Sequence, residues 1–239
     1  MPFPDFHNDT FVAFCDISGF KQKMSQNPEG ALQALKRFYS DAYGILQETR
    51  ERGRLPVYAL LVSDCAILVA DNTPVDGETS ADRDIAALEA LLSTIKRLNK
   101  NSLQYDIMLT TSIAYGPFHY EQRSELLGIE KNLLMGSAYI EAYIDQSAGK
   151  PKLQCGDCRI IEKNVPPQVL VALDNKGVTL FQMIQKQKKY YYYYWMRQRP
   201  EEIAEFQAAY KNTENLKYVG IRLLLQGHQD LNVIPNDNP

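Results

Sequence analysis

The chain has 239 residues, of which 45% are hydrophobic and 23% charged, and a formal net charge of −3. This length suits one large domain with an ample core, and the slight negative charge offers no general attraction for nucleic acid or anionic membranes. No apolar run approaches the roughly 20 residues of a membrane span, and the N-terminus lacks a signal-peptide pattern. We therefore expect a cytoplasmic protein that binds neither membranes nor nucleic acid.

The four cysteines do not suggest a disulfide framework. Cys155 and Cys158 have the C-x-x-C spacing of zinc and redox sites. However, the sequence has no second C-x-x-C, and its only histidines are His7, His119 and His228. A chance pair of reduced thiols is therefore favoured.

The stretch FVAFCDISGF, at residues 11–20, predicts a buried strand that ends in Asp16. Ser18 and Gly19 then predict a tight turn into a helix, where backbone N–H groups of residues 17–21 could face phosphate oxygens. A carboxylate beside such a cradle suits a Mg²⁺-bound triphosphate. An aspartate that merely ends a strand at a turn is the alternative.

A helix is expected next, because apolar residues within 28–52 recur at three- and four-residue spacing. Residues 55–70 (LPVYALLVSDCAILVA) then predict two strands joined at Ser63-Asp64. Asp64 follows Asp16 by 48 residues, which leaves room for a crossover helix, so the two strands can be neighbours. Two buried strands with an aspartate at matching ends form the pattern of a two-metal phosphoryl-transfer site.

Further elements alternate along the chain. Apolar spacing predicts a helix over 80–99, and residues 105–115 alternate as a strand that ends at Gly116-Pro117. Ser137 is the expected N-cap of another helix. Beyond it we expect a strand over 154–161, a short helix or strand over 168–173, a strand over 189–195, a helix over 201–211, a strand over 219–225 and a disordered tail over 232–239.

Five consecutive tyrosines, Tyr190–Tyr194, give the strand over 189–195 aromatic side chains on both faces. One interpretation is base stacking with single-stranded nucleic acid, helped by nearby lysines. We favour an edge strand packed on a helix, because the rest of the chain carries no basic surface.

The order of elements predicts an α/β (α+β) fold, a mixed sheet with helices mainly on one face. We expect residues 1–10 to be a flexible lead-in. Residues 11–199 should form the main domain, and residues 200–239 a C-terminal helix–strand appendage and tail.

From Phe11 to about Trp195 the chain resembles the catalytic domain of class III nucleotidyl cyclases. The resemblance rests on F-x-A-F-x-D-I-S-G-F, a helix, and a hairpin with S-D at its tip, where the family has F-x-D-I-x-G-F and x-I-G-D. It implies a ferredoxin-like core and conversion of a nucleoside triphosphate into a 3′,5′-cyclic monophosphate and pyrophosphate. Departures at the base-reading positions make the chain most similar to the bacterial pyrimidine cyclases of Pycsar anti-phage defence.

The resemblance also assigns roles to residues of the two aspartate motifs. Asp16, Asp64 and the carbonyl of Ile17 would bind two Mg²⁺ or Mn²⁺ ions per site. A homodimer is implied, in which one chain supplies the aspartates and the other the later helix. Two solvent-facing turn aspartates remain the alternative. The nucleotide would lie against Ile17, Ser18, Gly19, Phe20, Lys21, Tyr58 and Leu60.

The family's adenylate enzymes carry a lysine where this chain has Leu60, and an Asp or Thr where it has Leu133. Leucine neither donates nor accepts a hydrogen bond, so the family's purine recognition is absent. Tyr58 lies on the same strand face as Leu60 and either fills purine-sized space or packs on the helix over 80–99. We expect UTP as the substrate, with CTP as an open alternative.

The family's transition-state pair, an Asn and an Arg four residues apart on a helix, corresponds best to Tyr139 and Tyr143. The missing arginine must then be supplied elsewhere, or the chain is a cyclase-fold regulator that binds nucleotide without chemistry. A polymerase-palm or diguanylate-type transferase is a third hypothesis, and the diguanylate version is disfavoured because the G-G-[DE]-[DE]-F signature is absent. Candidate replacements for the arginine are Arg97, Arg123, Lys150 and Lys152.

Overall fold

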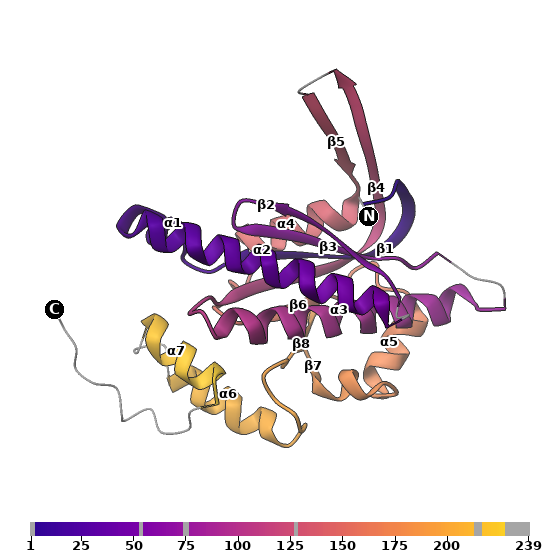
Figure 1. Ribbon diagram of the computed structural model, residues 1–239. Helices are drawn as coiled ribbons and strands as arrows, with labels where there is room; N and C mark the ends of the chain where they lie inside the picture. The colour runs from indigo at the N-terminus through magenta and orange to yellow at the C-terminus, as the bar shows by residue number, and fades with distance from the viewer. Residues whose placement is uncertain (1–2, 53–54, 74–76, 127–128, 213–216, 228–239) are drawn as a thin grey trace.

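The computed structural model describes residues 3–52, 55–73, 77–126, 129–212 and 217–227, with side chains outside 122–132 and 212–219. Eight strands form one mixed sheet (Figure 1), namely β1 (Phe6–Ile17), β2 (Val57–Val62), β3 (Cys65–Ala70), β4 (Leu109–Leu126), β5 (Ile129–Met135), β6 (Cys158–Ile161), β7 (Ile184–Gln187) and β8 (Tyr190–Tyr193). Their order is β2-β3-β1-β4-β6-β8-β7, and β5 pairs with β4. Neighbouring strands are antiparallel, except that β4 and β6 pair in parallel.

The described helices are α1 (Phe20–Gln26), α2 (Pro28–Glu51), α3 (Ser80–Leu103), α4 (Ser137–Ala148), α5 (Pro167–Asp174), the 3₁₀ helix η1 (Thr179–Met183), α6 (Glu202–Asn212) and α7 (Lys217–Leu225). None of these helices is both long and apolar enough to cross a lipid bilayer. Along β1, Phe11 and Ala13 face the large core beneath α2 and α3, whereas Val12 and Phe14 face a smaller core beneath α4. The predicted α/β fold is confirmed.

Local signals in the sequence determine where the two long helices begin. Asn27 caps α2 by accepting a hydrogen bond from the Gly30 N–H at 2.9 Å, and Pro28 at the first position needs no partner for a backbone N–H. Thr79 caps α3 through the Asp82 N–H. Each helix buries one stripe at three- and four-residue spacing, in α2 Ala31, Ala34, Phe38, Ala42 and Ile45.

The first ten residues are not all a flexible lead-in, because β1 begins at Phe6. Its residues pair with β4 from Phe6 onward, and both Phe6 and Thr10 are buried. The Thr10 hydroxyl donates a hydrogen bond to the Ala70 carbonyl at 2.7 Å. Long-range pairing therefore orders a segment whose own composition carries no strong strand signal.

Two predicted strands are also wrong in extent or type. β4 runs on through Gly116 and Pro117, because both pair with β1 and are held extended where Gly-Pro alone favours a turn. Residues 219–225 lie in helix α7 rather than in a strand. Periodicity cannot decide so short an apolar run, and Leu224 and Leu225 are both buried, which alternation along a strand does not give.

The tyrosine run lies inside the sheet, since β8 pairs with both β6 and β7. The predicted edge strand is therefore wrong. Tyr190, Tyr191, Tyr193 and Tyr194 are buried, so these four rings do not offer faces to nucleic acid bases. Tyr191, Tyr193 and Tyr194 belong to the large core, and the Tyr190 hydroxyl donates to the buried Asp145 carboxylate.

Asp157, just before β6, makes the free energy of unfolding depend on pH. Burial raises its pKa from 3.8 to about 6, and the hydrogen bond from the Gln154 N–H and the charge of Arg159 offset this only in part. The folded state therefore binds a proton more tightly than the unfolded state. The free energy of unfolding falls as the pH rises between these two values and stays lower above them.

We expect Asp157→Asn to raise the free energy of unfolding at pH 8 by about 1 kcal/mol, a value discounted for the partial exposure of the side chain. This corresponds to about 2–4 °C in Tm. Little change is expected near pH 3, where both states carry the proton. Thermal unfolding at the two pH values measures the difference, and an equal shift at both would contradict the electrostatic cause.

Candidate active site

The two aspartates predicted to act together lie side by side in the structure. Strands β1 and β3 are antiparallel neighbours, and Asp16 lies directly opposite Cys65. The Ile17 N–H donates to the Asp64 carbonyl at 3.0 Å, which fixes the hairpin tip against the end of β1. Carboxylate oxygens of Asp16 and Asp64 and the Cys65 sulfur all lie within 4.8 Å of one another. The expectation that the two strands are neighbours is confirmed.

Burial dominates the electrostatics of Asp16 and raises its pKa, and the nearby Asp64 charge raises it further. Hydrogen bonds from the Cys65 thiol, at 3.3 Å from Asp16 Oδ1, and from the Gln146 amide act in the opposite direction. The pKa of Cys65 is itself raised by burial and by the Asp16 charge, so the thiol is a donor rather than a thiolate ligand. Two adjacent carboxylates that repel each other are a donor set for a hard divalent cation, and they fit Mg²⁺ or Mn²⁺.

The expected phosphate cradle is narrower than the sequence predicts. The N–H groups of Ile17 and Ser18 already donate to the carbonyls of Asp64 and Met108, the latter at 2.8 Å. The amides of Gly19, Phe20 and Lys21 open helix α1, where first-turn N–H groups have no intrahelical acceptor. Gly19 has φ 72°, a left-handed conformation that glycine adopts without strain. The proposed cradle is therefore reduced to Gly19, Phe20 and Lys21.

Tyr58 and Leu60 lie on the Asp16 face of the sheet, because they pair through β3 with Val69 and Ile67. Leu60 is half-buried there. The Tyr58 ring lies 5.1 Å from the ring of Phe3.

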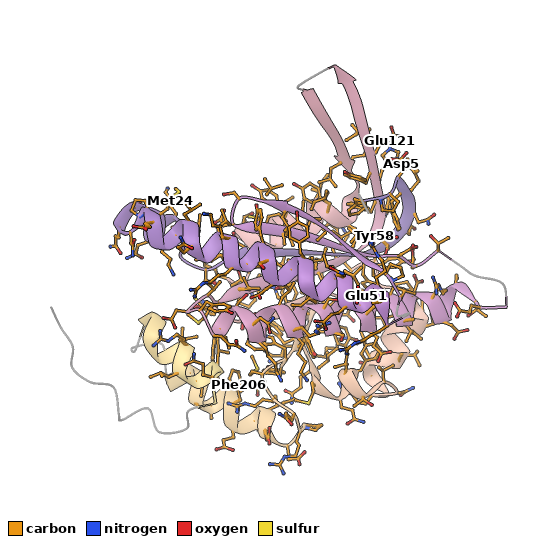
Figure 2. All side chains as sticks on the ribbon, in the orientation of Figure 1. Asp5, Met24, Glu51, Tyr58, Glu121 and Phe206 are labelled. Carbon is orange, nitrogen blue, oxygen red and sulfur yellow. The ribbon has the colours of Figure 1, made fainter. Side chains whose placement is uncertain are left out.

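Tyr58 also contacts groups from α2 and from the end of β3. The guanidinium of Arg50 in α2 lies over the Tyr58 ring, 5.6 Å from the ring centre. The Tyr58 hydroxyl hydrogen-bonds Asp71. With Phe3 and Glu51, Tyr58 lines a cavity of about 440 Å³. Figure 2 labels Tyr58 and Glu51. Tyr58 thus packs against the smaller core on the Asp16 face and contacts α2 through Arg50, rather than packing on α3 as the alternative had it.

Tyr139 and Tyr143 lie on one face of α4, as their spacing predicts. Their rings stack at 6.4 Å with an interplanar angle of 27°. The Tyr143 ring meets the edge of Phe14 at 5.3 Å, two residues before Asp16 on the same strand. Tyr143 remains 49% exposed, so half of its surface is available to a nucleotide or a second chain.

Sequence reasoning missed Gln146, which follows Tyr143 by three residues on the same face of α4. Its amide donates to the Thr110 hydroxyl at 2.5 Å and hydrogen-bonds Asp16. Thr110 is the residue of β4 directly opposite Asp16. The signal was the spacing of 139, 143 and 146, which follows one helical face. The end of α4 thereby lies against the Asp16 carboxylate of its own chain.

The proposed replacements for the transition-state arginine are placed as follows. Arg97 lies between α3 and α2, where it pairs with Glu48 at 2.6 Å, and it belongs to the face of the sheet opposite Asp16. The side chain of Arg123 lies outside the described residues. Lys150 and Lys152 follow α4 and are exposed, and Lys150 lines a cavity of about 650 Å³ together with Lys188, Lys189, Tyr190 and Tyr192.

A buried ion pair fixes the end of α4 on the sheet. Arg159 of β6 is 0% exposed and donates to both carboxylate oxygens of Asp145 at 2.8 Å. The same carboxylate accepts hydrogen bonds from the hydroxyls of Ser112 at 2.6 Å and Tyr190 at 2.8 Å. Arg159 is thus fully engaged, and its role is structural.

We expect Arg159→Met to lower the free energy of unfolding by about 3–5 kcal/mol, because it leaves the buried Asp145 charge unpaired. Chemical denaturation measures the loss. The control is Arg52→Met, whose exposed pair with Glu48, 3.6 Å long, should contribute less than about 1 kcal/mol. Equal losses in the two variants would contradict the role given to Arg159.

Comparisons with known proteins agree with this geometry at the level of the fold. No protein-family model matches the sequence, and no curated protein matches it. Among solved structures, the guanylate cyclase domain of RhGC from Catenaria anguillulae in complex with GTP has 17% identity and a TM-score of 0.53, with 80% of this chain and 98% of that chain covered. The adenylyl cyclase CyaB from P. aeruginosa has 15% identity and a TM-score of 0.52, with 80% and 95% covered. The chain therefore has the fold of class III nucleotidyl cyclase catalytic domains.

Proposed function

We propose that this chain is a metal-dependent nucleotidyl cyclase. The observation that carries the proposal is the pairing of Asp16 and Asp64 at the ends of neighbouring strands within a cyclase fold. In the reaction the 3′-hydroxyl of a nucleoside triphosphate attacks the α-phosphorus, and the bond from that phosphorus to the bridging oxygen breaks. Pyrophosphate leaves and the hydroxyl proton passes to solvent.

Different groups of the chain would bind the metal ions, bind the phosphates and orient Asp16. Asp16, Asp64 and the Ile17 carbonyl would hold two Mg²⁺ or Mn²⁺ ions, which when bound supply positive charge at the attacking and leaving oxygens. The N–H groups of Gly19 to Lys21 would donate hydrogen bonds to the phosphate oxygens at the start of α1. Gln146 and Cys65 orient Asp16 through hydrogen bonds.

UTP is the proposed substrate and cyclic UMP the product, as a second messenger in bacterial anti-phage defence. Support comes from Leu60 on the Asp16 face and from Leu133, 44% exposed on β5, where purine-reading side chains would be polar. CTP is the alternative substrate, because neither leucine distinguishes a carbonyl from an amine. We place the protein in the cytoplasm, where its four unpaired cysteines would stay reduced.

A homodimer with composite sites is also proposed. Several large apolar side chains are exposed on β5 and on α4, which follows β5 in the sequence. Exposed apolar side chains of this kind suit contact with a second copy of the chain. Their exposed fractions lie between 44% and 55% at Leu133, Met135, Ile140, Tyr143 and Ile144.

A nucleotide-binding regulator without catalysis is the second candidate, favoured by the stacked Tyr139 and Tyr143 in place of an Asn–Arg pair. Equilibrium binding of UTP with Mn²⁺, followed by chromatography of the same mixture, separates the two functions. The cyclase proposal expects cyclic UMP and pyrophosphate in equal amounts, and no product with Asp16→Ala. Tight UTP binding without product would favour the regulator.

A further inference from the structure

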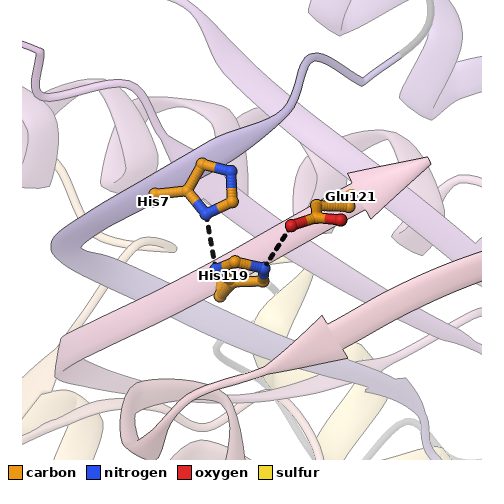
Figure 3. Close-up of side chains that lie close together, drawn as sticks. All are labelled: His7, His119 and Glu121. Atoms are coloured by element: carbon orange, nitrogen blue, oxygen red, sulfur yellow. Dashed lines mark hydrogen bonds and ion pairs between the residues drawn. The ribbon is translucent and has the colours of Figure 1, made fainter. Parts of the chain in front are cut away.

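Two histidines face each other between the start of β1 and the middle of β4 (Figure 3). His7 and His119 are directly paired in the antiparallel register. Their Nδ1 atoms lie 2.5 Å apart, and Glu121, two residues after His119 on the same side of β4, places Oε1 at 3.0 Å from His119 Nε2. Ligand atoms of all three residues lie within 4.8 Å of one another.

The hydrogen bonds determine which nitrogen of His119 is available. A carboxylate oxygen only accepts, so His119 Nε2 carries a proton and donates to Glu121. In the neutral ring the lone pair then lies on Nδ1, which points at His7. A carboxylate behind one ring nitrogen is the arrangement that holds a metal-ligating imidazole in its tautomer and raises its basicity.

We propose that His7 and His119 form a binding site for a transition-metal ion of the Zn²⁺ class, with Glu121 orienting His119. Imidazole nitrogens suit Zn²⁺, Ni²⁺ and Cu²⁺, whereas Mg²⁺ prefers oxygen. Two nitrogens on one tetrahedral Zn²⁺ lie roughly 3.3 Å apart, given Zn–N bonds of about 2.0–2.1 Å. His7 is exposed and can turn outward by the small amount required.

This site is separate from the aspartate site in both place and chemistry. His7 and Asp16 lie nine residues apart on β1, roughly 30 Å at the rise of an extended strand. An ion held there would tie the start of β1 to β4 at the base of the β4–β5 hairpin that projects from the sheet (Figure 1), where His119 pairs with Met135. The bound ion would therefore stabilise the folded state without entering the reaction.

The test uses the full chain carrying Asp16→Ala and Asp64→Ala, so that ions at the aspartate site do not contribute. Zn²⁺ is titrated by calorimetry in excess Mg²⁺ and reductant, and Co²⁺ is followed by its visible absorption. We expect one ion per chain, a nitrogen-rich Co²⁺ spectrum and a rise in Tm with Zn²⁺. Glu121→Gln should weaken the affinity 10–100-fold.

His7→Ala in this background should abolish the binding while leaving the Tm without metal unchanged, because His7 is exposed. The matched control is His228→Ala, which changes the remaining histidine of the chain. Equal Zn²⁺ affinity in His7→Ala and its parent, or no Zn²⁺ binding by the parent, would overturn the proposal.

Discussion

Asp16→Ala and Asp64→Ala should each lower kcat for cyclic nucleotide formation by roughly three orders of magnitude or more. Each carboxylate holds positive charge that offsets several kcal/mol of transition-state charge, and every 1.36 kcal/mol is about tenfold in rate. Because the two carboxylates lie within 4.8 Å and act as one unit, the double variant should be hardly slower than either single variant.

Initial rates of pyrophosphate release and of cyclic product formation give these values. Both variants should stay folded, and Asp16→Ala should unfold at the same or a higher temperature, since burial already disfavours the Asp16 carboxylate. Losses that add up in the double variant would mean that the two residues do not share a pair of metal ions.

Mixing inactive Asp16→Ala protein with inactive Tyr143→Ala protein should restore about a quarter of the wild-type activity. This follows if Tyr143 completes the site of the partner chain. Statistical exchange makes half of the dimers mixed, and each mixed dimer has one intact site of two. The exposed half of the Tyr143 ring and the apolar surface around it are what a second chain would contact.

Two controls make the mixing experiment decisive. Tyr143→Ala must first be inactive alone, and exchange of subunits must be shown with differently labelled chains. The ring contact between Tyr143 and Phe14 lies within one chain, so a site completed in cis is the competing arrangement. Full exchange without any recovery of activity would establish the cis arrangement or remove Tyr143 from the site.

Local sequence patterns were sufficient to predict the two strand ends that carry Asp16 and Asp64. An apolar run that ends in Asp16 and a hairpin with Asp64 at its tip each specify a strand end, and one crossover helix brings them together. The predicted boundaries of α2 and α3 were close because caps and apolar stripes are encoded within each helix. Two of the wrongly predicted elements, Phe6 to Thr10 and the strand through Gly116, take their conformation from pairing with a distant segment.

The finer chemistry depended on contacts that no local pattern contains. The thiol of Cys65 reaches Asp16 only because of the β1–β3 register, and Gln146 does so only because α4 packs on this face of the sheet. The amides of Ile17 and Ser18 are taken by the carbonyls of Asp64 and Met108, residues far along the chain. Such partners are decided by tertiary structure, and the phosphate cradle was therefore overestimated.

The most direct test of the central claim is one incubation of the purified protein with equal amounts of ATP, GTP, CTP and UTP in the presence of Mn²⁺. Mass spectrometry of the products, with pyrophosphate measured in parallel, identifies both the reaction and the base. We expect 3′,5′-cyclic UMP as the main product, one pyrophosphate for each cyclic UMP, and neither product with Asp16→Ala. Pyrophosphate without any cyclic product, or no turnover of any of the four nucleotides, would contradict it.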